Sequence, residues 1–198
     1  MGKILIAYAS MAGSTAEIAQ AIAEEITRGG LQVDVLPFRQ VKSLENYTGV
    51  IVGAPMIMGW HRSALGFLKK HRRTLRQIPL AVFIAAMSLT RTAETNVEGI
   101  PVFVDEKLPK APANAARLTF RERYATLPNY LQPIVRAARP AKPASIGFFG
   151  GRLEYGRLPW WAVLFAMIII QASAGERRNW PAIRAWAAGL VPTFQTGE

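Results

Sequence analysis

The stretch KILIAYASMAGSTAEIAQAIAEEI, residues 3–26, joins two different patterns of apolar residues. Residues 3–8 form an almost continuous apolar run, which is typical of a strand buried on both faces of a parallel sheet. Over residues 15–26 the apolar side chains recur every three or four positions, as they do along one face of a helix. A strand that passes into a helix through a short turn predicts the start of an alternating α/β fold.

The rest of the chain repeats this alternation. Apolar runs predict further strands at 31–37, 49–54, 79–87 and 144–150, and amphipathic patterns predict helices at 62–76 and 180–190. Strands that are apolar on both faces and separated by helices form a parallel sheet that is covered on both sides. The sequence therefore predicts one α/β domain, residues 1–198, with a doubly wound five-stranded parallel sheet.

Two segments exceed what this minimal fold needs. Residues 91–143 contain seven prolines and room for two short helices, more than one crossover requires. Residues 158–174, LPWWAVLFAMIIIQASA, predict a strongly apolar helix, but a membrane-spanning helix needs about 20 apolar residues. We expect this second insertion to lie at a membrane interface, in the protein core or in a homo-oligomer interface.

The charge of the chain is strongly positive and unevenly distributed. The formal net charge is +11, and no acidic residue occurs between Glu45 and Glu94 or between Glu122 and Glu154. Such basic segments predict an anionic partner. Nucleic acid is not expected, because no zinc-ligand spacing or aromatic RNA-binding strand accompanies the charge. The chain has no cysteine and starts without a secretory signal, so we expect no thiolate metal site and a cytoplasmic location.

The turn SMAGST, residues 10–15, lies where the first strand meets the first helix. In open parallel sheets ligands bind beyond the carboxyl ends of the strands, and a helix N-terminus there favours an anion. Gly13 allows close backbone approach, and the hydroxyl groups of Ser10, Ser14 and Thr15 add donors, so phosphate suits this turn. It lacks the lysine of a P-loop and two of the glycines of a dinucleotide fingerprint. A simpler alternative is that the serines only cap the helix.

Two further loops are expected at the same edge of the sheet. GAPMIMGWHRSA, residues 53–64, follows the third strand, and AAMSLTRTA, residues 85–93, follows the fourth. A flat ring fits between such loops, in contact with Trp60 or Met58 on one side. Ordinary packing is an equally simple interpretation of Trp60.

The turn resembles the phosphate loop of the flavodoxin family, Ser/Thr-x-Thr-Gly-x-Thr, with Ala12 at the position of the second Thr. This resemblance implies bound FMN and the strand order 2-1-3-4-5. The residues that it places around FMN are Ser10, Met11, Ala12, Gly13, Ser14, Thr15, Pro55, Met56, Ile57, Met58, Gly59, Trp60, Met87, Ser88 and Leu89.

Nearly the whole chain is similar to the menaquinone-dependent protoporphyrinogen dehydrogenases. The similarity rests on residues 52–54, 59, 63–64, 67, 69–71, 149–153 and 155. Residues 174–180 depart from the family and match it only at Gly175 and Trp180. The stretch between the fourth and fifth strands is also longer than in that family. The resemblance implies oxidation of protoporphyrinogen IX, a quinone as acceptor, and a peripheral position on the inner face of the cell membrane.

The remaining expected contacts follow from this resemblance and from the basic and apolar segments. Substrate contacts are expected at His61, Arg62, Arg152 and Tyr155, and membrane contacts at Trp160, Trp161, Phe165 and Ile169. No metal site and no catalytic acid–base pair is identified. Two alternatives stay open: an electron-transfer protein or quinone reductase, and a non-enzymatic membrane-associated module.

Overall fold

The central feature of the fold is a seven-stranded sheet with the strand order β2-β1-β3-β4-β9-β7-β6. The computed structural model describes residues 2–57, 59–91, 96–153 and 175–196. The strands of the sheet are β1 (Lys3–Tyr8), β2 (Gln32–Pro37), β3 (Gly49–Met56), β4 (Leu80–Ala86), β6 (Asn96–Val97), β7 (Ile100–Val104) and β9 (Ser145–Gly150). Neighbouring strands are parallel except β6 and β7, which pair antiparallel.

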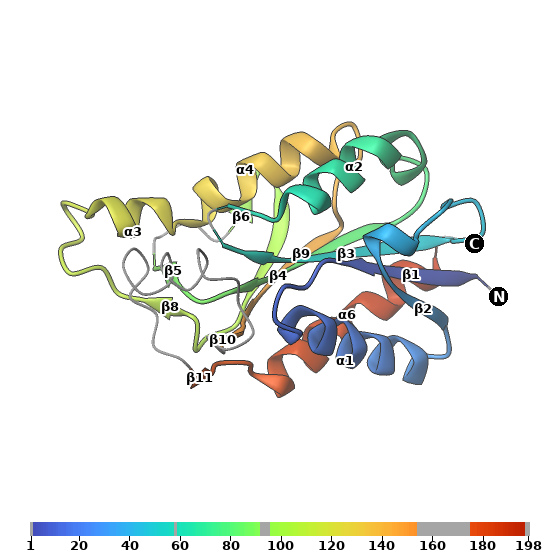
Figure 1. The fold of residues 1–198 in the computed structure, drawn as a ribbon, viewed down its shortest axis with the longest axis horizontal. Coiled ribbons are helices and arrows are strands. Elements are labelled where there is room, and N and C mark those ends of the chain that lie inside the picture. The colour runs from blue at the N-terminus through green and yellow to red at the C-terminus, as the bar shows by residue number, and fades with distance from the viewer. Residues whose placement is uncertain (1, 58, 92–95, 154–174, 197–198) are drawn as a thin grey trace.

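Helices cover both faces of the sheet (Figure 1). The helices α1 (Ser14–Arg28) and α6 (Trp180–Gln195) pack together on one face, and α2 (Arg62–Leu75) and α4 (Leu127–Ala138) pack together on the other. The α/β architecture with a mostly parallel sheet is therefore confirmed.

The apolar run of β1 explains why the sheet is buried on both sides. Ile4 and Ile6 point into the core layer beneath α1 and α6, whereas Leu5 and Ala7 point into the layer beneath α2 and α4. All four side chains have no exposed surface. Successive side chains of a strand point to opposite faces, so a strand with a helix layer on each face must be apolar at every position.

The prediction of five strands was wrong, because the insertion 91–143 extends the sheet. β7 pairs with the edge of β9, with Val102 opposite Ile146 and Val104 opposite Phe148. An uncovered β9 edge would present unpaired backbone groups, and β7 pairs with them. Pro101 is tolerated because it lies in the short outer hairpin, opposite Asn96 of β6.

The insertion also contributes a helix to the layer that covers the sheet and a strand to a second, two-stranded sheet. It contains α3 (Phe120–Tyr124) and α4, and its strand β8 (Pro109–Lys110) pairs with β5 (Leu89–Thr90), which directly follows β4. Helix α6 extends beyond the predicted 180–190, because Leu190 and Phe194 continue its buried face to Gln195.

The second predicted insertion lies outside the described residues. The chain enters it through β10 (Arg152–Leu153) and leaves it through β11 (Gly175–Glu176), which pair antiparallel. Met58, Tyr155, Trp160, Trp161, Phe165 and Ile169 also lie outside the described part of the chain.

Candidate functional site

The turn between β1 and α1 has an ordered backbone. Gly13 adopts the left-handed conformation, with φ of 89°, and is the N-cap residue of α1. Its N–H donates a hydrogen bond of 3.0 Å to Ser10 Oγ. A residue with a Cβ atom is strained at this φ, so glycine allows the chain to turn sharply into the helix.

This geometry is suited to an anion. The first N–H groups of α1 have no intrahelical acceptor, and the helix dipole places partial positive charge at the same end. The N-cap residue makes no side-chain capping bond, and the Ser10 hydroxyl holds the turn rather than the helix end. The simple capping interpretation is therefore disfavoured, and the loop fits a phosphate group.

The two hydroxyl residues that begin α1 lie deep in the site. Ser14 is 7% exposed and Thr15 is 2% exposed. Ser14 Oγ accepts a hydrogen bond of 2.9 Å from the backbone N–H of Arg152, which follows β9. This hydrogen bond links the phosphate loop to the segment that follows β9. The hydrogen of the Ser14 hydroxyl stays available as a donor.

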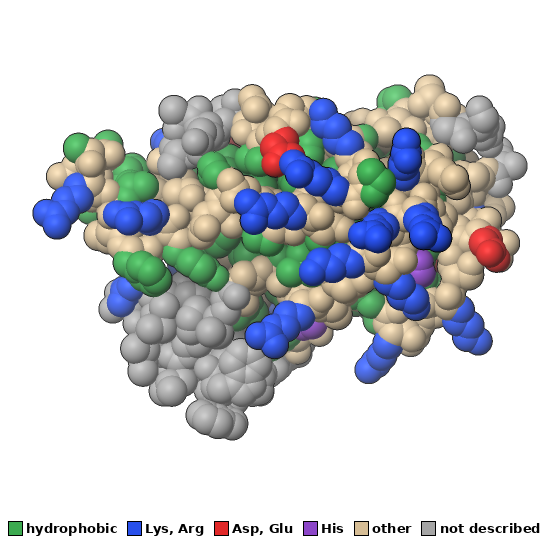
Figure 2. All heavy atoms as spheres, turned by 90° about the horizontal axis from the view of Figure 1, so that it is seen from above, with side chains coloured by type: hydrophobic (Ala, Val, Ile, Leu, Met, Phe, Trp, Pro, Cys, Tyr) green, Lys and Arg blue, Asp and Glu red, His purple; other side chains and the backbone are tan. Residues whose placement is uncertain are grey.

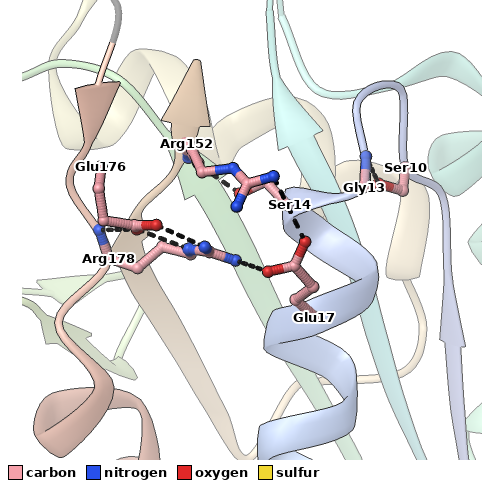
Figure 3. A network of polar contacts seen from close by, with 7 residues as sticks. All are labelled: Ser10, Gly13, Ser14, Glu17, Arg152, Glu176 and Arg178. Atoms are coloured by element: carbon pink, nitrogen blue, oxygen red, sulfur yellow. Dashed lines mark hydrogen bonds and ion pairs between the residues drawn. The ribbon is translucent and has the colours of Figure 1, made fainter. Parts of the chain in front are cut away.

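A network of charged side chains lies beside the phosphate loop (Figure 3). Glu17, in the first turn of α1, pairs with Arg178 at 2.5 Å and lies 3.8 Å from a guanidinium nitrogen of Arg152. Arg178 also pairs with Glu176 at 2.5 Å, and its guanidinium lies 4.5 Å from the centre of the Trp180 ring. The Arg178 side chain is only 3% exposed, so the surrounding groups hold it in place.

This network balances the charge close to the loop. The hydrogen bond from Arg178 holds the pKa of Glu176 below its usual value. Glu17 alone would repel a phosphate at the end of α1, but the cations of Arg152 and Arg178 offset its charge. Arg152, a predicted substrate contact, thus lies beside the phosphate loop and pairs with Glu17.

Trp60, in the loop after β3, does not expose its ring for stacking against a ligand. Trp60 is 4% exposed, belongs to the core layer beneath α2 and α4, and donates from Nε1 to the carbonyl of Ala54 at 3.2 Å. Gly59 has φ of 99° and accepts a hydrogen bond of 3.0 Å from the N–H of Ile57, which makes a tight turn. The packing interpretation of Trp60 is favoured.

His61 and Arg62 begin the next helix. The imidazole Nδ1 of His61 accepts a hydrogen bond of 3.3 Å from the N–H of Ser63 and lies 2.8 Å from its Oγ. Burial lowers the pKa of His61, so the ring is neutral and can accept at neutral pH. The structure thus gives His61 a helix-capping contact, and Arg62 is exposed in the first turn of α2.

The loop after β4 is positioned by the segment that follows β11. The guanidinium of Arg177 donates to the carbonyl of Met87 at 3.1 Å, and its backbone N–H donates to Gly151 at 3.1 Å. A Cβ atom on Gly150 would lie 2.0 Å from the Arg177 carbonyl oxygen, so this crossing requires glycine. Sequence reasoning missed Glu17, Arg177 and Arg178, since a departure from a family pattern does not reveal a new contact.

Comparisons with known proteins agree with this arrangement. A family model described as a flavodoxin domain matches residues 5–178. The chain is 27% identical over 177 residues to the protein of Escherichia coli named protoporphyrinogen IX dehydrogenase [quinone], covering 88% of this chain and 82% of that protein.

Solved flavodoxins show the same fold at low sequence identity. An archaeal flavodoxin aligns with a TM-score of 0.50 and 13% identity, covering 98% of this chain and 99% of the other. The two-electron reduced flavodoxin of Megasphaera elsdenii aligns with a TM-score of 0.52 and 11% identity, covering 96% and 98%. On the strength of the family match, which spans most of its length, the chain belongs to the flavodoxin-domain family.

Proposed function

We propose that this protein is an FMN-dependent oxidoreductase that oxidises protoporphyrinogen IX and uses a quinone as electron acceptor. The observation that carries the proposal is the 27% identity, over 88% of the chain, to an enzyme whose name states this reaction. The flavodoxin-domain match and the geometry of the phosphate loop support FMN as the cofactor. When bound, the flavin supplies the two-electron chemistry, and the protein supplies binding and orientation.

Several segments of the chain would together bind the cofactor. The N–H groups at the start of α1 and the hydroxyls of Ser14 and Thr15 would hold the phosphate. The loops at 55–60 and 87–89 would flank the ring, and the hydrogen bond from Arg177 to Met87 would keep the second loop in place. Ala12 removes one hydroxyl from the loop but leaves the backbone N–H groups, which are the main donors.

We also propose that the protein lies on the anionic inner surface of the cell membrane. Side chains of lysine and arginine gather on the face formed by α2 and α4, where few acidic side chains are present (Figure 2). This cationic face includes the exposed residues Lys69, Lys70, Arg72, Arg73, Arg76 and Arg136. Each cation near an anionic membrane contributes about 1 kcal/mol of attraction. Among the described residues, no helix is both long enough and apolar enough to cross a bilayer.

An anaerobic stopped-flow experiment tests the proposed reaction. FMN-loaded protein is mixed with protoporphyrinogen IX, which should bleach the visible flavin band, and menaquinone added afterwards should restore it. Rapid reduction by a nicotinamide cofactor but not by protoporphyrinogen would instead indicate a general quinone reductase. A purified protein that binds no flavin would indicate a non-enzymatic module.

A further inference from the structure

The first insertion forms one side of a cavity of about 450 Å³. The other side consists of residues at the ends of β3 and β4, including Met56, Met87 and Leu89. Small-molecule sites typically have volumes of about 300–1,000 Å³ and mainly apolar walls. This cavity therefore has the size and the position of a site for a small molecule next to the two loops expected around the flavin ring.

Hydrogen bonds fix the insertion to the β4 loop, so the cavity is preformed. The N–H of Thr90 donates to the carbonyl of Ala125 at 2.7 Å, and its hydroxyl donates to the carbonyl of Glu122 at 2.8 Å. On the other side, the N–H of Arg91 donates to the carbonyl of Lys110 at 2.8 Å. These bonds join segments that are distant in the sequence and hold both walls together.

The cavity does not include the phosphate loop. None of the residues 10–15 lines it. The wall formed by Met56, Met87 and Leu89 belongs to the loops that are expected to flank the flavin ring. The wall formed by the insertion lies outside the residues expected to contact FMN.

The insertion wall combines aromatic surface with positive charge. Phe120 is 79% exposed at the cavity, and Tyr130 is buried beneath it and stacks on Phe148, with ring centres 6.3 Å apart. Lys110 and Arg121 also line the cavity and are exposed.

Glu122, the carboxylate among the described residues that line the cavity, is engaged elsewhere. The oxygens of Glu122 accept hydrogen bonds from the N–H groups of Ala113 and Thr119, at 2.7 and 2.8 Å, and from the Thr119 hydroxyl. These bonds lower the pKa of Glu122 and hold its carboxylate against Ala113 and Thr119 of the same insertion. The described part of the cavity wall is therefore mainly apolar and aromatic, and it includes the cationic side chains of Lys110 and Arg121.

We propose that this cavity binds the reducing substrate of the flavin, a mainly apolar ring system bearing a carboxylate, which Lys110 and Arg121 contact. The proposal deepens the proposed function and rests on it for the flavin at the shared wall. Arg152, which was the predicted substrate contact, pairs with Glu17. The proposal therefore assigns the contact with the carboxylate of the substrate to residues of the insertion instead.

A binding experiment with redox-inert probes tests this assignment. FMN-loaded protein is titrated with 1-pyrenecarboxylate and with its neutral counterpart 1-pyrenemethanol, and binding is followed by fluorescence anisotropy. The double variant Lys110→Glu, Arg121→Glu should bind the carboxylate at least about tenfold more weakly and the neutral probe within about twofold of wild type. The exposed change Phe120→Ala should weaken both probes by about fivefold, because apolar contact is lost.

The matched control is Arg117→Glu, Arg123→Glu. It changes the net charge by the same amount, both residues lie in the same insertion and are exposed, and neither lines the cavity. The control should leave both affinities within about twofold of wild type, since only the long-range field changes.

The proposal would be overturned by no effect of the Lys110 and Arg121 changes, by an equal effect of the control, or by equal affinity of wild type for the two probes. The last would indicate a neutral ring, such as a quinone, as the occupant. The flavin spectrum of each preparation is recorded as well. Loss of flavin with intact probe binding would refute the cofactor proposal and not the cavity, whereas normal flavin without probe binding would refute the cavity alone.

Discussion

Gly13 provides a test of the phosphate loop that can be quantified from its backbone geometry. With φ of 89° it lies in the left-handed region, where a residue with a Cβ atom costs about 1–2 kcal/mol relative to glycine. Gly13→Ala should therefore lower the free energy of unfolding by about 1–2 kcal/mol, provided that the loop keeps its conformation. For a chain of 198 residues this corresponds to a fall in Tm of about 2–8 °C.

The same strain can instead appear in cofactor affinity. If the loop of the cofactor-free variant relaxes, stability is preserved, but FMN must then restore the left-handed turn. The cost of about 1–2 kcal/mol would reappear as a roughly 5- to 30-fold increase in the Kd for FMN. Gly13→Asn should lose less by both measures, because asparagine tolerates this conformation, and Gly13→Val should lose most.

Urea unfolding of the cofactor-free protein and titration of FMN by quenching of its fluorescence measure the two quantities. Gly66→Ala is the matched control, since Gly66 is in the interior of α2 and an added Cβ atom would meet nothing within 4 Å. This control should stabilise the protein by about 0.5–1 kcal/mol and leave FMN affinity unchanged. A Gly13→Ala protein with wild-type stability and wild-type FMN affinity would refute the reasoning about the loop.

Three further changes probe the phosphate site, the cationic face and the charged network. Replacing Ser14 and Thr15 by alanine should raise the Kd for FMN at least about tenfold in isothermal titration, because each hydrogen bond to a charged group is worth about 1.5–3 kcal/mol; unchanged affinity would place the phosphate elsewhere. Reversing Lys69 and Lys70 to glutamate should weaken co-sedimentation with anionic vesicles at least tenfold, at about 1 kcal/mol per charge, and salt should weaken the wild type likewise; binding indifferent to both changes would contradict the cationic face. The depressed pKa of Glu176 means that its ionised form stabilises the fold above the usual value of 4.5, and that this contribution is lost as pH falls through the lower folded-state pKa. Urea unfolding should therefore show Glu176→Gln less stable than wild type near neutral pH and the gap closing in acid, whereas a constant gap would argue against the ion pair.

Several features of the fold follow from the sequence alone because they depend on local patterns. The buried run of β1, the amphipathic α1 and the glycine between them are sufficient to predict a parallel α/β sheet with an anion site after its first strand. Residue periodicity determines which elements form, and parallel strands bring their carboxyl ends to one edge. The flavodoxin pattern of residues 10–15 added the nature of the ligand.

The surroundings of that edge were decided only by the tertiary structure. The proline-rich insertion was expected to hold two short helices and to exceed one crossover, but no local pattern indicated that its strand β7 would pair with β9 and extend the sheet. Trp60 is marked by its sequence as a candidate ring contact, yet packing buries it. In both cases the residues contact a strand or a core layer, and no local sequence pattern encodes the position of that strand or layer.

The charged network and the cavity depend on contacts between segments that are distant in the sequence. Glu17 and Arg178 are 161 residues apart in sequence, and the walls of the cavity come from the ends of β3 and β4 and from the insertion. A local pattern predicts that an arginine is charged, but not which carboxylate it meets. The sequence by itself thus determined the parallel sheet and the phosphate loop. Only the packing of distant segments decided how the charge beside that loop is balanced and where a second ligand can bind. The reason is that the free energy of an interaction between two groups depends on the distance between them, which only folding establishes.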